Sequence, residues 1–354
     1  AARIDRLEPE EKRVIQEGAV VGRVFWEGAL ARLVPEIKGE SLETRLKSLE
    51  LKELVAEQND SQLPGEQEWS FNHILVRDVA YESIPRAKRA AKHIEVARWV
   101  EDQATDRLEG FAEMLAYHWE QAALVDLEMG ALLGRSAASE ETRDRAVRYL
   151  KLAGDKAKSV HSNVTANDHY SRALAIVDSL LEDRAGTGDG LADQHLAILY
   201  NHAEVLEELG EYNKAIRHME TVRENAAERG LRGLQGDALR LLGNLYRDKG
   251  DLTEAERLAQ LALENLTGEE QIRSRGEALL LMGKIYHDIG KPTVSQRWAE
   301  EALTLAEQEG DRRIELAALP LLGSLSLHRG DLDHAEQLFQ QAITLAKDIG
   351  DKRV

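Results

Sequence analysis

The sequence contains no cysteine, few prolines and few aromatic residues. Without cysteine, no disulfide framework and no thiolate metal site can form. Only 6 prolines and 5% aromatic residues among 354 favour helices over a β-sandwich. No apolar run approaches the roughly 18 residues that a membrane-spanning helix needs. A chain of this length exceeds a single compact core, so we expect two or more modules.

A net positive charge is also lacking, since the formal charge is −18. This balance argues against a non-specific nucleic-acid binder, because phosphate contacts need clustered Lys and Arg. The N-terminus has no apolar signal region and no initiator Met. We therefore expect a cytoplasmic protein and a piece of a longer chain. The 11 histidines show no H-E-x-x-H or comparable spacing, so no metal site is predicted.

Glycines recur every 40 residues in the second half of the chain, at Gly210, Gly250, Gly290 and Gly330. Each stands between two stretches with apolar residues at helical spacing. Because glycine readily adopts the left-handed conformation that ends a helix, each unit is predicted to be helix, turn, helix, turn. Small residues share this period, in the first helix at Ala203, Gly243, Gly283 and Gly323, and in the second at Ala215, Ala255, Ser295 and Ala335. They predict close approach of the paired helices.

A small residue, an aromatic three residues later, a glycine turn and then an alanine resemble the tetratricopeptide repeat. A degenerate copy precedes the four repeats, with Gly154, Ala166, Tyr170 and Ala173 in matching positions. The resemblance implies a right-handed α-solenoid, here with repeats of about 40 residues rather than about 34.

The first hundred residues show no repeat. Helices are predicted over 9–22 and 25–34, and from an N-cap at Ser41, whose helix carries one apolar side formed by Leu42, Leu46, Leu49 and Leu51. A two-stranded hairpin should follow, with β-structure only within about residues 54–73. Three helices and then a hairpin is the order of a winged helix. Further on, Leu115, Trp119 and Ala122 mark a stacking helix, and residues 126–143 are predicted to be an insertion or ragged turn.

The predicted fold is mainly α, with more than two-thirds of the residues helical. We expect a winged-helix domain and connecting helix over residues 1–105. A helical linker and the degenerate repeat should occupy residues 106–190, and four repeats residues 191–354.

The stretches "VIQEGAVVGRVFWEGALARL", "LKSLELKELV" and "WSFNHILVRDVAYESIP" resemble the winged-helix segment of signal-transduction ATPases with numerous domains. The similarity is to the bacterial branch fused to class III adenylate or guanylate cyclases, kinases or transcription regulators. It implies that this chain follows an ATPase domain that binds ATP or ADP. No P-loop, cyclase or kinase motif occurs here, so we expect no enzymatic activity and no cofactor in this chain.

The stretch "FNHILVRDVAY" over residues 71–81 is similar to the Met-His-Asp motif of related ATPases. The resemblance implies that His73 contacts the β-phosphate of ADP in the parent protein. Asn72 and Ile74 depart from the motif on either side. The alternative is a buried or capping histidine at a strand–helix junction.

A DNA-binding transcription regulator, with the repeats binding an effector, is the alternative function. Its third helix would enter the major groove with basic side chains. Arg45, Lys47 and Lys52 alternate there with acidic residues, which argues against DNA. The basic cluster over residues 84–93 is interpreted as a solvated face or as a surface that contacts the ATPase domain.

The predicted function is a regulatory module whose winged helix gates the ATPase and whose repeats bind a protein or peptide. In tetratricopeptide repeats, the residues flanking the small residue face the groove. Carried over, they are Tyr200, Glu204, Arg240, Asn244, Arg247, Lys284, His287, Ser324 and His328. Basic residues beside an Asn indicate an acidic ligand. Alternatively, nearby acids neutralise them, namely Asp237, Asp248, Glu277 and Asp288.

Overall fold

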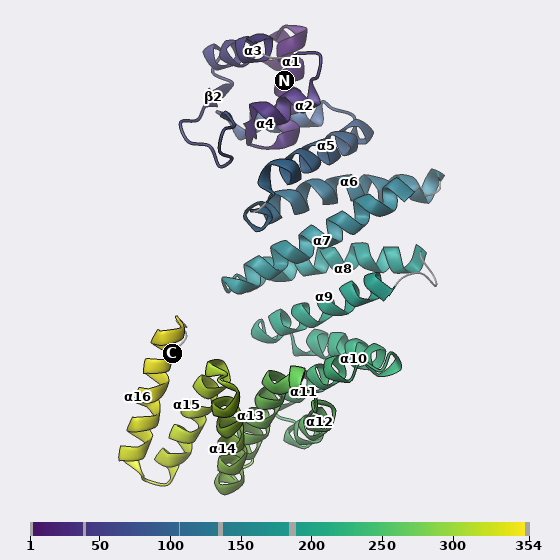
Figure 1. Cartoon of the computed structure of the whole chain (residues 1–354). Helices are drawn as coiled ribbons and strands as arrows, with labels where there is room; N and C mark the ends of the chain where they lie inside the picture. Colours follow the sequence, from purple (N-terminus) through teal and green to yellow (C-terminus); the bar gives the residue numbers. More distant parts are fainter. Residues whose placement is uncertain (1–2, 38–39, 106, 134–136, 184–188, 351–354) are drawn as a thin grey trace. The chain divides into compact units, whose positions relative to one another are not determined.

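The computed structural model describes residues 3–37, 40–105, 107–133, 137–183 and 189–350 and is mainly α-helical (Figure 1). Helices hold more than two-thirds of the residues, as predicted. The chain forms two compact units, Ala1–His195 and Leu196–Val354, which are described separately. No helix in the described part is long and apolar enough to cross a membrane.

The first unit opens with a small α/β region. Its elements are η1 Ile4–Arg6, α1 Pro9–Val21, β1 Val24–Trp26, α2 Glu27–Leu33, α3 Glu40–Leu51, β2 Val55–Glu57, β3 Glu68–Phe71 and α4 Ile74–Glu82. β3 is the central strand and pairs antiparallel with both β1 and β2. The rings of Phe25 and Phe71, 5.3 Å apart, pack in the core, where Phe25 lies against Gly18 of α1.

Several predictions for this region were wrong. β-structure is not confined to residues 54–73, because Phe25 and Trp26 form a strand instead of starting a helix. The buried Trp26 explains the difference, since its Nε1 donates a hydrogen bond to the Glu68 carboxylate at 3.0 Å. α3 includes Ser41 rather than being capped by it. Leu51 is 87% exposed, because it lies in the last turn of α3 away from the buried leucines.

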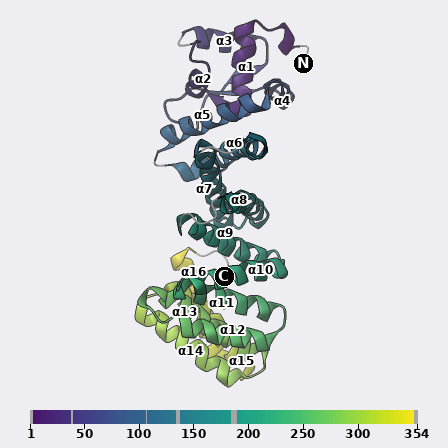
Figure 2. The ribbon, with the colours of Figure 1, turned by 90° about the vertical axis from the view of Figure 1, so that its right-hand side faces the viewer.

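The rest of the first unit is a stack of helices. They are α5 Arg86–Ala104, η2 Leu108–Phe111, α6 Ala112–Leu133, α7 Ala137–Ser159 and α8 Asn163–Asp183. Each of α5 to α8 packs against the next (Figures 1 and 2). Residues 126–133 and 137–143 are helical, so the predicted ragged turn was wrong for them, and residues 134–136 of that prediction lie outside the described residues. Gly154 permits close packing of α7 on α8, since a Cβ there would lie 2.6 Å from the Tyr170 ring.

The second unit consists of helix pairs. The helices are α9 Asp189–Glu208, which contains the unit boundary, α10 Tyr212–Glu228, α11 Arg232–Asp248, α12 Leu252–Asn265, η3 Glu269–Gln271, α13 Ile272–Asp288, α14 Pro292–Glu309, α15 Arg312–His328 and α16 Leu332–Ile349. The four repeated glycines have φ between 74° and 85°, which confirms the predicted turns. The predicted close approach also occurs, since the Ser295 hydroxyl donates to the Gly283 carbonyl at 2.7 Å.

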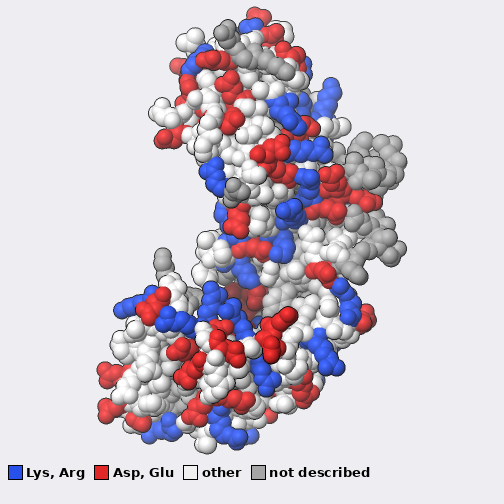
Figure 3. Space-filling view, in the orientation of Figure 1, with Lys and Arg blue, Asp and Glu red and all other residues white. Residues whose placement is uncertain are grey.

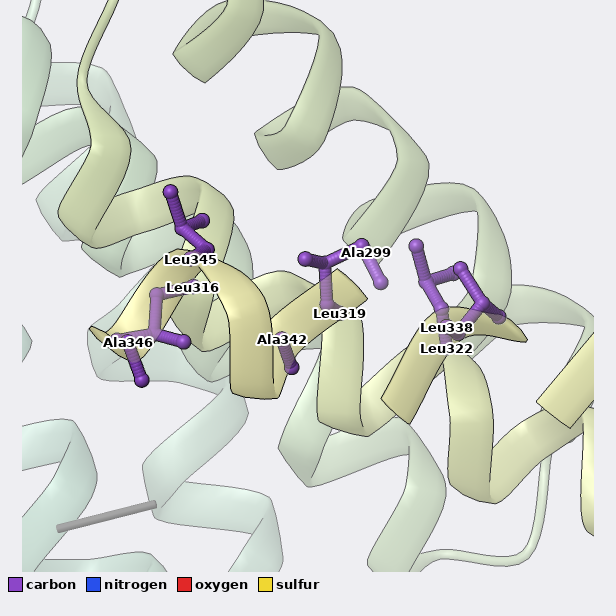
Figure 4. Close-up of a cluster of buried hydrophobic side chains, with 8 residues drawn as sticks. All are labelled: Ala299, Leu316, Leu319, Leu322, Leu338, Ala342, Leu345 and Ala346. Carbon is purple, nitrogen blue, oxygen red and sulfur yellow. The ribbon is translucent and has the colours of Figure 1, made fainter. Parts of the chain in front are cut away.

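The end of the second unit has a compact apolar core. Leucines and alanines of α14, α15 and α16 interdigitate there (Figure 4). Leu319 of α15 and Leu345 of α16 are 4% and 6% exposed. Stacking of successive pairs therefore buries the apolar faces that a single pair would leave in water.

Candidate functional site

The first helices of successive pairs form a continuous layer in the second unit. α13 contacts both α11 and α15 in addition to its own partner α14. The predicted groove residues are distributed over this layer, on α9, α11, α13 and α15. Eight residues on α9, α11 and α13 form what we call the polar seam: Tyr200, Glu207, Arg240, Asn244, Arg247, Glu277, Lys284 and Asp288.

Arg240 connects three helices at the start of the polar seam. Its Nη2 donates to the Tyr200 hydroxyl of α9 at 2.9 Å. Its Nε lies 3.3 Å from the Glu277 carboxylate of α13, and the side chain is only 15% exposed. Burial raises the pKa of Tyr200, so the phenol stays neutral and accepts this hydrogen bond. Arg240 is therefore part of the packed layer rather than an open binding residue.

Asn244 lies one turn further along α11 and donates a hydrogen bond to the Glu207 carboxylate of α9. Burial raises the pKa of Glu207 to about 7, and the negative charge of Asp248 adds to this rise. The hydrogen bond from Asn244 opposes it. This carboxyl group is consequently half protonated near neutral pH. Glu207 was not among the groove residues predicted from the repeat spacing. Its position 37 residues before Asn244, on the preceding first helix, was the available signal.

Arg247 completes the α11 contribution and is held by two acids. Its Nε lies 2.7 Å from Asp288 of α13, and its Nη1 lies 3.2 Å from the neighbouring Asp248. Both arginines that were predicted to attract an acidic ligand, Arg240 and Arg247, thus already have carboxylate partners within the chain.

Lys284 differs from these arginines. It lies half-buried on α13, and within the described residues it makes no ion pair or side-chain hydrogen bond. Burial lowers its pKa, and the positive charge of Arg247 lowers it further, while Asp248 and Glu207 oppose the shift. A half-buried ammonium ion without a paired carboxylate is an energetically unfavourable arrangement that a ligand carboxylate would relieve.

The remaining predicted groove residues lie on the same layer. The rings of His287 on α13 and His328 on α15 have centroids 5.3 Å apart. Glu204 on α9 and Ser324 on α15 are half-buried. Hydrogen bonds and ion pairs thus join the predicted residues of α9 and α11 to each other and to α13. The contact between His287 and His328 joins α15 to this group.

His73 occupies the N-cap position of α4, two residues after the end of β3, so it lies at the predicted strand–helix junction. Its side chain is exposed and makes no capping hydrogen bond, so the buried or capping alternative was wrong. The next two residues, Ile74 and Leu75, are 48% and 73% exposed. The junction therefore presents an imidazole beside two large apolar side chains.

Arg45 and Lys47 of α3, and Lys52 just after its end, are engaged by acids. Arg45 lies 2.6 Å from Glu10 of α1, Lys52 lies 2.5 Å from the buried Glu11, and Lys47 pairs with Glu50 and Glu57. Basic and acidic side chains are also intermixed over the face drawn in Figure 3. Among the described residues, no group of His, Asp and Glu side chains is placed to hold a metal ion.

Comparison with known proteins identifies the repeats. Residues 194–267 and 274–348 match the family model of the tetratricopeptide repeat. No curated protein sequence matches the chain. A Rap conjugation gene regulator of plasmid pLS20, in complex with the Phr* peptide, is 13% identical, with a TM-score of 0.53 over 75% of this chain and 71% of that one.

Two further solved structures are similar. A Rap protein complexed with competence and sporulation factor is 16% identical, with a TM-score of 0.52 over 75% of this chain and 73% of that one. A signal transduction ATPase with numerous domains and a tetratricopeptide-repeat sensor, from Pyrococcus horikoshii, is 13% identical, with a TM-score of 0.41 over 96% of this chain and 63% of that one. At these identities the likeness concerns the fold alone. Residues 194–267 and 274–348, which contain the whole polar seam, are tetratricopeptide repeats.

Proposed function

We propose that this chain is a non-catalytic interaction module in which the polar seam binds a protein or peptide through a ligand carboxylate. The observation that carries the proposal is Lys284, a half-buried ammonium group with no ion-pair partner in the described chain. Arg240 and Arg247 already have carboxylate partners within the chain, so we do not expect either of them to be the primary contact of the ligand carboxylate. A carboxylate at Lys284 would form a charge-assisted hydrogen bond in a partly desolvated site.

A binding titration tests this proposal. Fluorescently labelled peptides rich in Asp and Glu are titrated with the wild type, with Lys284→Met, and with Lys291→Met as the control. Lys291 is an exposed lysine at the start of α14 that lies 5.6 Å from the Tyr286 ring. We expect Lys284→Met to weaken binding at least ten-fold, Lys291→Met to leave it unchanged, and rising salt to weaken it. Equal affinity of the wild type and Lys284→Met would refute the proposal.

We also propose that the α/β region is a winged helix that gates an ATPase domain of a longer signalling protein. The element order helix, strand, helix, helix, strand, strand supports this assignment, and β1 supplies the strand that the sequence analysis missed. The exposed His73, Ile74 and Leu75 support a contact between this junction and another domain. In the full-length protein, His73→Ala should weaken ADP binding. Unchanged ADP affinity would contradict the phosphate-sensing role.

The DNA-binding alternative has less support. Arg45, Lys47 and Lys52 would have to exchange their carboxylate partners for phosphates. Specific retention of promoter DNA by this chain at physiological salt, in a gel-shift experiment, would favour that alternative.

A further inference from the structure

A pocket of about 160 Å³ opens between α4, α5 and α6 in the first unit. Its polar lining includes Tyr81, Arg89, Gln121 and the buried His93. Leu124 forms part of the apolar side and is 43% exposed at the rim. Because a water molecule occupies about 30 Å³ in the liquid, the pocket has room for a ligand of several non-hydrogen atoms.

Arg89 is the cation in this pocket whose charge is not balanced. Its guanidinium lies 4.6 Å from the Tyr81 ring centroid, and among the described residues it has no carboxylate partner. Arg77 lies at the same distance from the same ring, yet it pairs with Asp78 and donates to the Ala19 carbonyl. The contrast shows that stacking on Tyr81 does not by itself leave an arginine unpaired.

The other charges of the lining nearly cancel. Arg86 and Glu128 form an ion pair at 3.3 Å, and both are largely exposed. His93 stays neutral, because burial and the nearby His118 hold its pKa well below the ordinary value. Its Nε2 is hydrogen-bonded to the Tyr81 hydroxyl at 2.8 Å, which fixes both side chains. The pocket therefore carries one net positive charge, and that charge belongs to Arg89.

We propose that this pocket binds a small monocarboxylate with a short apolar chain. The carboxylate would pair with the Arg89 guanidinium, whose planar fork matches two carboxylate oxygens. Gln121 has no hydrogen-bond partner among the described residues, and its amide is available as a further donor. The carbon chain would lie on Leu124 and Val125. A dianion such as phosphate is a poorer match, because the lining offers one net charge and Glu128 stands at the rim.

The test is a calorimetric titration of the chain at fixed ionic strength with three probes: butyrate, butyramide and inorganic phosphate. We expect saturable binding of butyrate, at least ten-fold weaker binding of phosphate, and none of butyramide, which lacks the charge. Arg89→Gln should weaken butyrate binding at least ten-fold. Arg98→Gln is the matched control, since Arg98 is an exposed arginine of the same helix that does not line the pocket.

A second variant keeps the test decisive if Arg89→Gln fails to fold. Leu124→Trp fills the pocket from its exposed rim while retaining Arg89, and it should abolish butyrate binding in a protein with unchanged circular dichroism. The proposal is overturned if butyrate binding does not saturate, if phosphate binds as tightly as butyrate, or if folded Leu124→Trp binds butyrate like the wild type.

Discussion

Glu207 shows how one half-buried carboxyl group makes the repeats sensitive to pH. Its pKa is about 7 in the folded state and near 4.5 when unfolded, so between these values only the folded chain keeps the proton. Stability therefore falls as pH rises through this window, and the loss persists above it. Glu207→Gln should raise the free energy of unfolding at pH 8 by on the order of 2 kcal/mol and have little effect at pH 4.5.

Urea unfolding of the wild type and Glu207→Gln at both pH values measures this difference. Glu208→Gln is the control, because Glu208 is its exposed neighbour. Equal stabilisation by both substitutions at pH 8 would attribute the effect to net charge rather than to burial of Glu207.

His118 creates the opposite dependence in the first unit. It is fully buried, its Nδ1 lies 2.8 Å from the Nδ1 of His93, and burial lowers its pKa to about 3. Arg77 and Arg89 are nearby positive charges, and the rings of Tyr81 and Tyr117 pack against His93. Below about pH 6.5 this histidine is protonated in the unfolded chain but stays neutral in the folded chain. The free energy of unfolding therefore falls as pH falls, by at most about 1.4 kcal/mol per pH unit for one histidine.

Melting temperatures between pH 8 and pH 4.5 test this linkage. His118→Gln should reduce the loss of stability below pH 6.5, to which the buried His93 also contributes, whereas substitution of the exposed His334 should not change it. Parallel curves for the wild type and His118→Gln would show that His118 does not govern the acid sensitivity.

At the scale of the elements, the paired helices depend on small residues where they cross. A Cβ at Gly283 would lie 3.0 Å from Leu321 of α15 and 3.4 Å from the Ser295 carbonyl of α14. Gly283→Val should therefore overpack the crossing and lower the free energy of unfolding by about 1–3 kcal/mol. Gln308→Val, at an exposed position of α14, should cost much less. A similar cost for both variants, by urea unfolding, would mean that the crossing tolerates the added volume.

The sequence predicts the helix pairs well because each rests on local and repeated signals. The turn glycines and the small residues recur with one period, and each copy supports the others. β1 was not predictable in this way. Three residues show no alternation, and Phe25 and Trp26 become a strand only by pairing with β3 more than forty positions later.

The polar seam was predictable only in part, because its contacts join residues that are far apart in the sequence. Spacing on α11 placed Arg240, Asn244 and Arg247 on one face, but their partners come from other helices. The 3.3 Å pair with Glu277 and the contact of Asn244 with Glu207 depend on the stacking of α9, α11 and α13. Burial of Arg240, which makes it structural, follows from the same packing.

At the scale of the whole molecule, two separately packed units should respond separately to damage. Leu319 is buried at the end of the second unit, so Leu319→Ala should cost about 2–5 kcal/mol. In a stacked array each pair contacts only its neighbours, so amides of α15 and α16 should lose most protection from hydrogen exchange. Amides of α1 to α4 should keep theirs. Ile343→Ala, at an exposed position of α16, is the control and should change protection little. A uniform loss of amide protection in both units of Leu319→Ala would contradict their separate packing.

The state of Lys284 is the most direct test of the account, because the proposed function rests on its unpaired ammonium group. Nuclear magnetic resonance of the chain with ¹³C-dimethylated lysines reports the pKa of each amine, and Lys284→Met assigns the signal. The account predicts that Lys284 titrates below the exposed lysines in the free chain, because of burial and Arg247. An acidic peptide should raise that pKa by supplying a carboxylate. A Lys284 signal that titrates with the exposed lysines and ignores the peptide would contradict the account.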